Sequence, residues 1–552
     1  MIRVLVASAL SLGPLAALPQ TSVQPPQRTF YVSPLGNDLA TGLTPLTPWR
    51  TIARVNQQVL AAGDTVCFKG GAVFPGNLVL DASESGTPTE PITFTAYGLG
   101  PAGIAAGTGN GFDLYNVAGI RIANLSVIGS GIATSMGIGI SFYADLPGDV
   151  KLPFVRIEDC RVTGFRRGGI SIGAYSGRTG FEDVRVERCL LDQNGNNGMA
   201  VWGFYDTTGG QTPDDYAHHS IYVGHNVIQS NHGDPSVTTK HTGSGVEIAQ
   251  AYDVLVEYNR ALENGRDNSW TGGGPVGLWM WDVLEGVIQF NESYRNKSGT
   301  LDGGGFDLDG GCVRCVLQYN YSHDNDGPGF MIAQFPGSRP MRRCSVRYNI
   351  SERDGGRSNA GALQLWSGDP LGVAPEALVF HNNTVYVEPK ALGTAKAFRA
   401  FGSGRLGDCG FANNVFLTGG SGAWLGELAL STPPAFAGNL YYAPLGPFVV
   451  RDGGVNFASL AAWRAARGQE LVQGVPSGFE MDPLLTAPGM GGTLGNATQL
   501  QTLDAYRLLP TSPLNDLGLF LPTFGVVLPA LDFYGNPVPA GLGLSIGADE
   551  GA

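Results

Sequence analysis

The chain has 552 residues, among them 82 glycines, and only 15% of its residues are charged, while 10% are aromatic. This composition excludes an intrinsically disordered chain, and glycines without a three-residue period exclude collagen. The net charge of −13 argues against a nucleic-acid-binding surface, which needs a basic stripe, and no internal apolar run is long enough to span a membrane. The glycine excess instead predicts many short strands joined by tight turns.

Residues 1–20 have the pattern of a secretory signal peptide. Arg3 supplies the charged start, and the apolar stretch from Leu5 to Leu18 is too short to span a membrane. An apolar N-terminal strand is the alternative interpretation. We therefore expect a secreted or periplasmic protein. Seven cysteines, an odd number, exclude a dense disulfide scaffold.

An asparagine repeat organises the middle of the chain. Seven segments rich in apolar or β-branched residues end at an asparagine, at steps of 29 to 33 residues: Asn226, Asn259, Asn291, Asn320, Asn349, Asn382 and Asn414. Two earlier segments carry Cys160 and Cys189 at the same position. Because asparagine tolerates a left-handed backbone and bonds neighbouring peptide groups, we expect an asparagine ladder at the bends of stacked coils.

A second family of short strands alternates with the first and usually opens with glycine. Examples are Gly245–Ala249, Gly277–Trp281 and Gly305–Asp309, and no amphipathic helix of useful length interrupts residues 115–440. Without crossover helices, repeats of this length predict an all-β fold, a parallel β-helix. We expect an N-terminal strand, a capping helix from Arg50 to Leu60 and first coils in 28–100, the β-helix in 101–440, and a C-terminal cap in 441–552 with a helix at Phe457–Arg467.

One face of the predicted helix carries large aromatic side chains. Because side chains alternate along a strand, Ile248, Met280 and Leu308 point to the core while their neighbours point outward. The outward positions include four of the eight tryptophans, Trp202, Trp279, Trp281 and Trp366, together with Arg399. Flat indoles beside hydrogen-bonding groups suit sugar rings, so we interpret this exposed face as a carbohydrate-binding surface.

Three carboxylates share that face and are the predicted catalytic residues. Glu247 and Asp307 fall in one column two coils apart, roughly 9–10 Å, and Asp307 and Asp309 are two residues apart, roughly 6.5–7 Å. Both spacings approach those of the paired carboxylates of glycosidases, roughly 5–9.5 Å. A structural cation site and plain surface charges are the alternatives.

Long insertions flank the strand that carries Glu247. Residues 203–220 and 231–244 exceed the neighbouring turns in length, as functional loops often do. We expect Lys240 and His241 to contact substrate and His232 to share the cleft wall with His241. His323 is placed in the turn below Asp307, as a proton-transfer or cation-binding group or a solvated turn residue. No metal-ligand spacing such as HExxH is present.

Several segments resemble secreted bacterial right-handed β-helix proteins of the pectin-lyase-like superfamily, which includes polysaccharide lyases and glycoside hydrolases. They are 29–38, 48–53, 62–66 and 86–94 near the start, 305–310 with 318–325 in the middle, and 531–536 with 546–550 near the end. The resemblance covers about residues 28–550. It implies a right-handed helix and a carbohydrate-active enzyme, and it does not fix the reaction.

Three functions remain open at this point. The first is a glycoside hydrolase acting on a polysaccharide. The second is a polysaccharide lyase, which needs a base such as Lys240 or Lys297 and a cation such as calcium to neutralise a uronate. The third is a non-catalytic carbohydrate-binding protein. We rank the hydrolase first, because a carboxylate-lined face repels a polyuronate. We expect a monomer that requires no cofactor, with calcium as the one ion to be tested.

Overall fold

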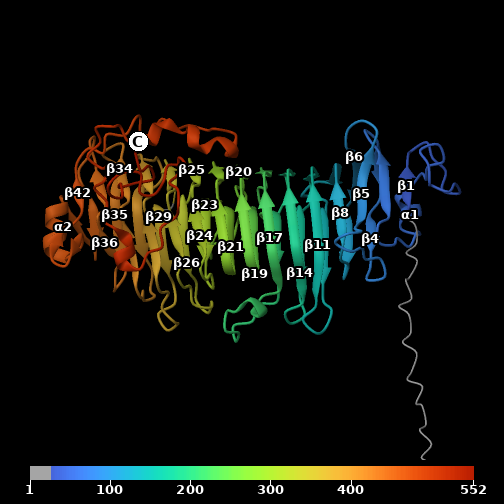
Figure 1. Cartoon of the computed structure of the whole chain (residues 1–552), viewed down its shortest axis with the longest axis horizontal. Coiled ribbons are helices and arrows are strands. Elements are labelled where there is room, and N and C mark those ends of the chain that lie inside the picture. The colour runs from blue at the N-terminus through green and yellow to red at the C-terminus, as the bar shows by residue number, and fades with distance from the viewer. Residues whose placement is uncertain (1–26, 358, 552) are drawn as a thin grey trace, which may run out of the picture.

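The chain folds as a right-handed parallel β-helix, as predicted (Figure 1). The structure is a computed structural model that describes residues 27–357 and 359–551. The predicted signal peptide, residues 1–20, lies outside the described residues. Within the described part, no helix is long and apolar enough to cross a membrane.

Each coil contributes strands to three faces, and neighbouring coils pair in parallel register. The cleft face consists of β4 (Leu78–Leu80), β7 (Phe112–Tyr115), β10 (Ile140–Ala144), β13 (Ile170–Ala174), β16 (Asn197–Trp202), β23 (Gly304–Asp309), β26 (Phe330–Gln334), β29 (Gly361–Ser367), β32 (Lys396–Phe401), β35 (Trp424–Ala429) and β38 (Val450–Asp452). The second face consists of β1 (Thr29–Val32), β2 (Thr65–Lys69), β5 (Ile92–Tyr97), β8 (Ile120–Ala123), β11 (Lys151–Glu158), β14 (Gly180–Glu187), β17 (His218–Gly224), β24 (Val316–Gln318), β27 (Ser345–Arg347), β30 (Leu378–His381), β33 (Cys409–Ala412) and β36 (Ala435–Ala437).

Two long strands, β19 (Ser244–Glu257) and β21 (Val276–Gln289), run through both of these faces. The third face consists of β3 (Val73–Pro75), β6 (Ala102–Gly107), β9 (Leu125–Gly129), β12 (Arg161–Thr163), β15 (Leu190–Asp192), β18 (Val227–Gln229), β20 (Arg260–Leu262), β22 (Glu292–Tyr294), β25 (Tyr321–His323), β28 (Ile350–Glu352), β31 (Thr384–Val387), β34 (Val415–Thr418), β37 (Leu440–Tyr442) and β42 (Phe479–Glu480). Short pieces complete the chain: β39 (Val455–Phe457), β40 (Leu471–Val472), β41 (Val475–Pro476) and the 3-10 helices η1 (Pro213–Asp215), η2 (Ala497–Thr502), η3 (Asp504–Tyr506) and η4 (Leu521–Phe524).

The core lies between the three faces and repeats from coil to coil. Ile248, Met280 and Leu308 are fully buried and adjacent in register, which confirms the inward column predicted from alternation. Burial of such apolar columns is the main force that holds stacked coils together. All seven cysteines are buried and free.

The predicted asparagine ladder exists, with one member corrected. Asn383, not Asn382, bonds the coils on either side: its Oδ1 accepts from Asn349 N (3.1 Å) and its Nδ2 donates to Asn414 Oδ1 (2.9 Å). The left-handed residue is the one before each ladder asparagine, and Asn382 (φ 52°) holds that place. Sequence reasoning missed a second buried ladder five residues further on, made of Asn194, Asn231, Asn264, Asn296 and Asn325, ending at Asp354.

The N-terminal helix is shorter than predicted. It spans only α1 (Ile52–Val55), capped by the Thr51 side chain. Asn56 ends it because its side chain donates to Asn77 O (2.8 Å) and accepts from Val79 N (3.3 Å), which ties this residue to β4.

The C-terminal region both caps the last coils and returns along the molecule. The helix α2 (Leu460–Arg467), within the predicted stretch, buries Trp463 against Phe398 and Phe436. Beyond it, the chain runs back over the third face as far as the middle coils (Figure 1), where Glu292 on β22 accepts hydrogen bonds from Leu494 N (2.7 Å) and Gly495 N (2.9 Å). The region therefore covers more than the end of the helix.

Candidate functional site

Two columns of outward residues build the floor of the site. In the first, Glu247, Trp279 and Asp307 are partners in register on β19, β21 and β23. In the second, Trp281 pairs with Asp309. The predicted order of these residues is thus confirmed, and the spacing of two coils places Glu247 and Asp307 roughly 9.4–9.8 Å apart along the ladder.

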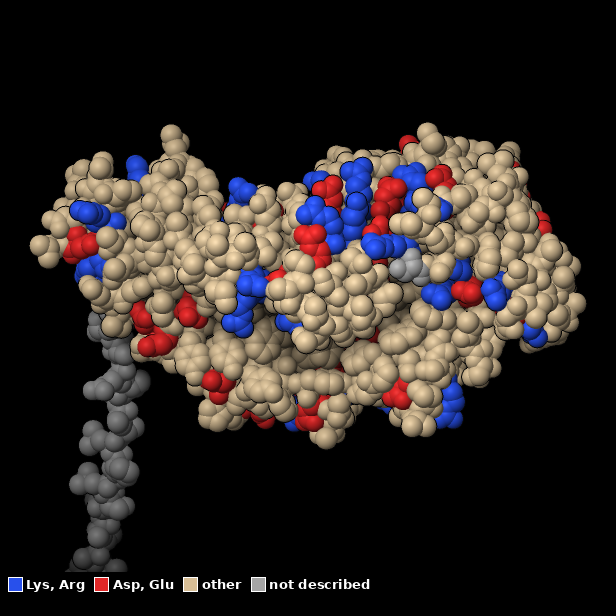
Figure 2. Space-filling model, turned by 180° about the vertical axis from the view of Figure 1, so that it is seen from behind, with Lys and Arg blue, Asp and Glu red and all other residues tan. Residues whose placement is uncertain are grey.

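A cleft of about 530 Å³ lies over this floor, large enough for a small oligosaccharide. The loops 230–243, 263–275 and 295–303, which precede cleft-face strands, contribute His241, Trp270 and Asp302 to its lining. Phe335, which follows β26, and Trp366 also line it. Seen from behind, the surface is hollowed along its middle, with charged side chains gathered mainly outside the hollow (Figure 2).

These loops make the face less exposed than alternation alone suggested. Trp279 retains 7% exposure and Asp307 only 2%. His241 packs edge-on against Trp279 (ring centroids 5.2 Å apart) and lies beside Trp270 (6.0 Å). The result is a cleft with aromatic walls and a partly desolvated floor.

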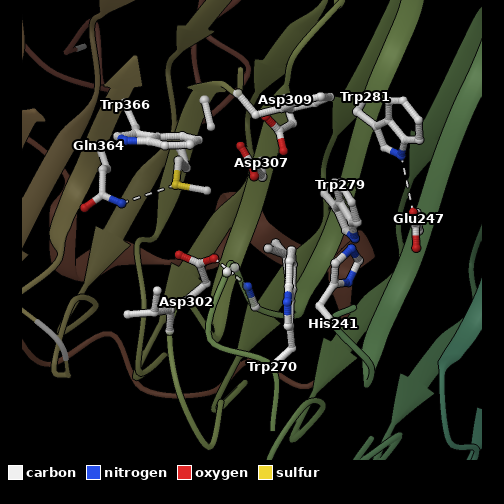
Figure 3. Close-up of a pocket in the computed structure, with 18 of the residues that line it drawn as sticks. His241, Glu247, Trp270, Trp279, Trp281, Asp302, Asp307, Asp309, Gln364 and Trp366 are labelled. Carbon is white, nitrogen blue, oxygen red and sulfur yellow. Dashed lines mark hydrogen bonds between the residues drawn. The ribbon is translucent and has the colours of Figure 1, made fainter. Parts of the chain in front are cut away.

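Four carboxyl groups line this space, and three of them come from β23 and the loop before it: Asp302 from the loop, and Asp307 and Asp309 from the strand (Figure 3). Asp307 is buried and its Oδ1 has no hydrogen-bond partner in the described structure. Desolvation, with the nearby charges of Asp309 and Asp302, raises the pKa of Asp307 well above its usual range. Desolvation, with the charges of Asp302 and Glu247, raises the pKa of Asp309 to about 7.

Asp302 is a carboxylate that sequence reasoning missed. It lines the cleft, is partly exposed, and accepts a hydrogen bond from Gly274 N (2.8 Å). Desolvation raises its pKa, and the Gly274 N–H opposes that rise. Asp309 is also partly exposed, whereas Asp307 is not. Of these three carboxyl groups, Asp302 and Asp309 are therefore the two that substrate can reach.

Glu247 also lines the cleft and is partly exposed, and its charge acts on Asp309. Trp279 lies between Glu247 and Asp307 in the ladder and in the close-up view (Figure 3). The Oε1 atom of Glu247 accepts a hydrogen bond from the indole N–H of Trp281 (3.2 Å). This contact gives Glu247 a role in holding Trp281, and Asp302 joins Glu247, Asp307 and Asp309 as a fourth carboxyl group of the cleft.

The structure brings some predicted binding residues to the cleft and leaves others outside. Trp279, Trp281, Trp366 and His241 line it. Lys240 is exposed and outside the lining. Arg399 pairs with Glu427 (Nε to Oε2, 3.1 Å), and the Trp202 indole N–H donates to Ser171 Oγ (3.0 Å); neither side chain lines the cleft.

The predictions for two histidines were wrong. His323 is the last residue of β25 on the third face, so it lies in a strand and not in the predicted turn, and it is fully buried and stacked on Tyr294 and Tyr321. His232 lines a separate hollow, where its Nδ1 lies 3.1 Å from Arg266 Nη2. Neither side chain lines the cleft.

Trp270 and Phe335 were also missed as site residues. Both lie in loops, where no strand register predicts the direction of a side chain. The one available signal was loop length: 263–275 exceeds the neighbouring turns. In the part of the chain that the structure describes, no group of three His, Cys, Asp or Glu side chains is arranged to hold a metal ion.

The chain has a distant sequence relative among known proteins. No family model matches the chain. It is 24% identical over 488 residues to a lacto-N-biosidase of Bifidobacterium longum subsp. longum, with 69% of this chain and 29% of that protein covered. The chain thus spans less than a third of the length of this relative.

Solved structures with some likeness include the native GH136 lacto-N-biosidase from Eubacterium ramulus, at 19% identity and a TM-score of 0.49, covering 73% of this chain and 68% of that one. Pectate lyase Pel9A has 14% identity and a TM-score of 0.37, covering 95% and 97%. The chain's own strand register, rather than these likenesses, establishes its β-helix.

Proposed function

We propose that the protein is a glycoside hydrolase that cleaves a neutral glycan in the cleft, with Asp309 as proton donor and Asp302 as the opposing carboxylate. The observation that carries this proposal is a pair of partly exposed carboxyl groups, both with raised pKa, in one aromatic-walled cleft. Glycosidases use two carboxyl groups that flank the scissile bond.

The reaction follows from the protonation states. Because the pKa of Asp309 is about 7, a large fraction of the protein molecules carry a protonated Asp309 at neutral pH. Asp309 transfers this proton to the glycosidic oxygen as the bond to the anomeric carbon breaks. Asp302, held by the Gly274 N–H, supplies the negative charge that faces the oxocarbenium-like carbon. Water then supplies a hydroxyl group to that carbon and its remaining proton restores the acid.

Asp307 acts beneath this pair as a positioning residue. Its carboxyl group is too buried to reach substrate, and desolvation raises its pKa, which favours the neutral form. A neutral Asp307 adds no charge repulsion when Asp309 ionises, and it excludes water from the floor. This assignment revises the predicted catalytic set of Glu247, Asp307 and Asp309.

The charges of the cleft favour a neutral glycan over a polyuronate. The twenty described residues that line it include Glu247, Asp302, Asp307 and Asp309 but no lysine or arginine. A uronate carboxylate would meet negative charge without a cation to balance it. The distant relation to a lacto-N-biosidase supports glycosidase chemistry and makes an aryl lacto-N-bioside a reasonable short substrate to include.

The test is incubation with neutral polysaccharides, polygalacturonate and aryl glycosides, with and without EDTA or added calcium. We expect new reducing ends from a neutral substrate and no unsaturated uronate. An unsaturated product would establish a lyase instead. Binding without any product would establish a non-catalytic carbohydrate-binding protein. The EDTA arm tests the calcium prediction.

Location and assembly are further parts of the proposal. We propose a secreted or periplasmic protein, on the basis of residues 1–20, and a monomer. Fractionation of expressing cells and light scattering of the purified protein test these two points.

A further inference from the structure

The outward column that carries Trp281 and Asp309 continues beyond the cleft toward the N-terminus. On β13 and β16, Gly173 and Trp202 are partners in register, and on β7, β10 and β13 the same column contains Tyr115, Tyr143 and Gly173. Val201 pairs with Ile248, and the residue after Ile248 pairs with Trp281. Trp202, which follows Val201 and does not line the cleft, therefore continues the column of Trp281 along the axis of the helix.

Trp202 is held in the same way as Trp281. The indole N–H of Trp202 donates to Ser171 Oγ on the preceding coil, and the indole N–H of Trp281 donates to Glu247 on its preceding coil. A small residue lies in register before each tryptophan. A Cβ on Gly173 would come within 2.3 Å of the Trp202 indole, so this ring rests directly on the glycine.

The aromatic surface extends over the next coils. Trp202 contacts Tyr143 (ring centroids 6.0 Å apart), and Tyr143 stacks on Tyr115 (6.1 Å). Tyr115 is 44% exposed. Beside them, Tyr175 and Phe204 form a second exposed aromatic pair (5.3 Å). Aromatic rings that remain exposed in a row on a soluble protein indicate a binding surface.

The polar groups around this surface indicate the chemistry of the ligand. Asp145 accepts a hydrogen bond from the Tyr115 hydroxyl (2.7 Å), and Asp113 is exposed beside it. Ser141 and Ser171 lie in the neighbouring column with Asp113. Rings with hydroxyl and carboxylate neighbours suit a neutral sugar chain, whose rings have an apolar face and a hydroxyl rim, and not a polyanion.

We propose that Trp202, Tyr143 and Tyr115, here called the aromatic track, bind the continuation of the neutral glycan whose scissile bond lies in the cleft. This inference rests on the proposed function and adds to it a substrate class, an extended chain that runs along the helix axis. Two observations support it. One outward column continues in register from Tyr115 to Asp309, and the indole N–H groups of Trp202 and Trp281 each donate to a side chain on the preceding coil.

The test measures polysaccharide binding separately from catalysis. The inactive Asp309→Asn protein is run in native gels containing galactomannan, mixed-linkage β-glucan or arabinogalactan, with polygalacturonate as the anionic comparator. We expect retardation by a neutral polysaccharide, and about five- to tenfold weaker affinity after Trp202→Ala or Tyr143→Ala. Phe524→Ala, a comparably exposed aromatic residue (54%) in the C-terminal region, is the matched control and should change nothing.

Gly173→Ala is a second variant in case Trp202→Ala does not fold. It keeps Trp202 but displaces its indole, so it should also weaken polysaccharide binding. Absence of retardation, retardation by polygalacturonate alone, or equal affinity of the track variants and the parent overturns the inference. If an aryl glycoside is hydrolysed while the track variants bind normally, only the track is refuted. If no glycoside is hydrolysed but binding depends on Trp202, only the proposed reaction is refuted.

Discussion

At the scale of single residues, the site works by keeping carboxyl groups away from water. Asp307 is buried and its Oδ1 has no hydrogen-bond partner among the described residues, and the charges of Asp309 and Asp302 act on it. Because ionisation of one group opposes ionisation of the next, the cluster retains protons that isolated carboxyl groups would release. Two predictions follow from the direction of these shifts.

The first concerns the pH dependence of activity. Asp309 must carry a proton to act as an acid, and its pKa is raised to about 7. We expect kcat/KM to fall as the pH rises through about 7, and to fall again at acid pH as Asp302 gains a proton. A pH profile on an aryl glycoside checks this. A profile that stays flat from pH 6 to 9 would remove Asp309 from the role of acid.

The second concerns stability. The pKa of Asp307 is higher in the folded protein than in the unfolded chain, where it is roughly 3.9. Above about pH 4 the unfolded chain releases this proton first, so stability falls as the pH rises. Asp307→Asn should therefore raise the melting temperature at pH 7.5 by several degrees and leave it nearly unchanged at pH 4. Thermal unfolding at both pH values measures the difference. A lower melting temperature of Asp307→Asn at pH 7.5 would contradict the claim that Asp307 is buried without a compensating charge.

The residues of the floor could be predicted from the sequence, and the residue from the loop could not. Alternation along β21 and β23 places Trp279, Asp307 and Asp309 correctly, because strand geometry fixes the direction of each side chain. Asp302 lies in a loop, where direction depends on contacts such as the Gly274 hydrogen bond. The lean of Trp281 onto Glu247 likewise arises from packing.

At the scale of the coil, two buried asparagine ladders fix the bends. Asn291 donates to Val256 O and Asn320 Oδ1 (3.0 Å each) and accepts from Asn259 N (2.8 Å). Such a side chain replaces hydrogen bonds that buried peptide groups could not otherwise make.

Removal of one ladder asparagine should therefore lower the stability of the fold. Asn291→Ala leaves several buried groups unsatisfied, and we expect a loss of roughly 2–4 kcal/mol of unfolding free energy. Asn456→Ala, at an exposed position of β39, should change stability by less than about 0.5 kcal/mol. Chemical denaturation compares them, and equal effects would contradict the ladder's role.

The asparagine repeat can be seen in the sequence, but where two asparagines are adjacent the sequence does not show which of them belongs to the ladder. At Asn382 and Asn383 the spacing fits either residue, and only the left-handed backbone of Asn382 decides. The second ladder went unnoticed because its members fall in turns without an apolar pattern around them.

At the scale of the molecule, the C-terminal chain ties distant coils together. Its return along the third face could not be predicted, because nothing in its proline-rich sequence says which coils it contacts. Glu292, which is buried, holds the returning chain through Leu494 N and Gly495 N.

Loss of that tether should loosen the returning segment without altering the cleft. In Glu292→Gln the amide offers one acceptor in place of two, so we expect faster hydrogen exchange in residues 490–510. Glu285→Gln, on the surface, is the control. Unchanged exchange in Glu292→Gln would show that other contacts hold the segment.

The central claim is that Asp302 and Asp309, and not the buried Asp307, carry the reaction. Its most direct test is kcat/KM of Asp302→Asn, Asp309→Asn and Asp307→Asn on one neutral substrate. We predict losses of roughly 10²–10⁴-fold for the first two and less than about tenfold for the third. Substantial activity in Asp302→Asn or Asp309→Asn, or a loss in Asp307→Asn as large as theirs, would contradict the claim.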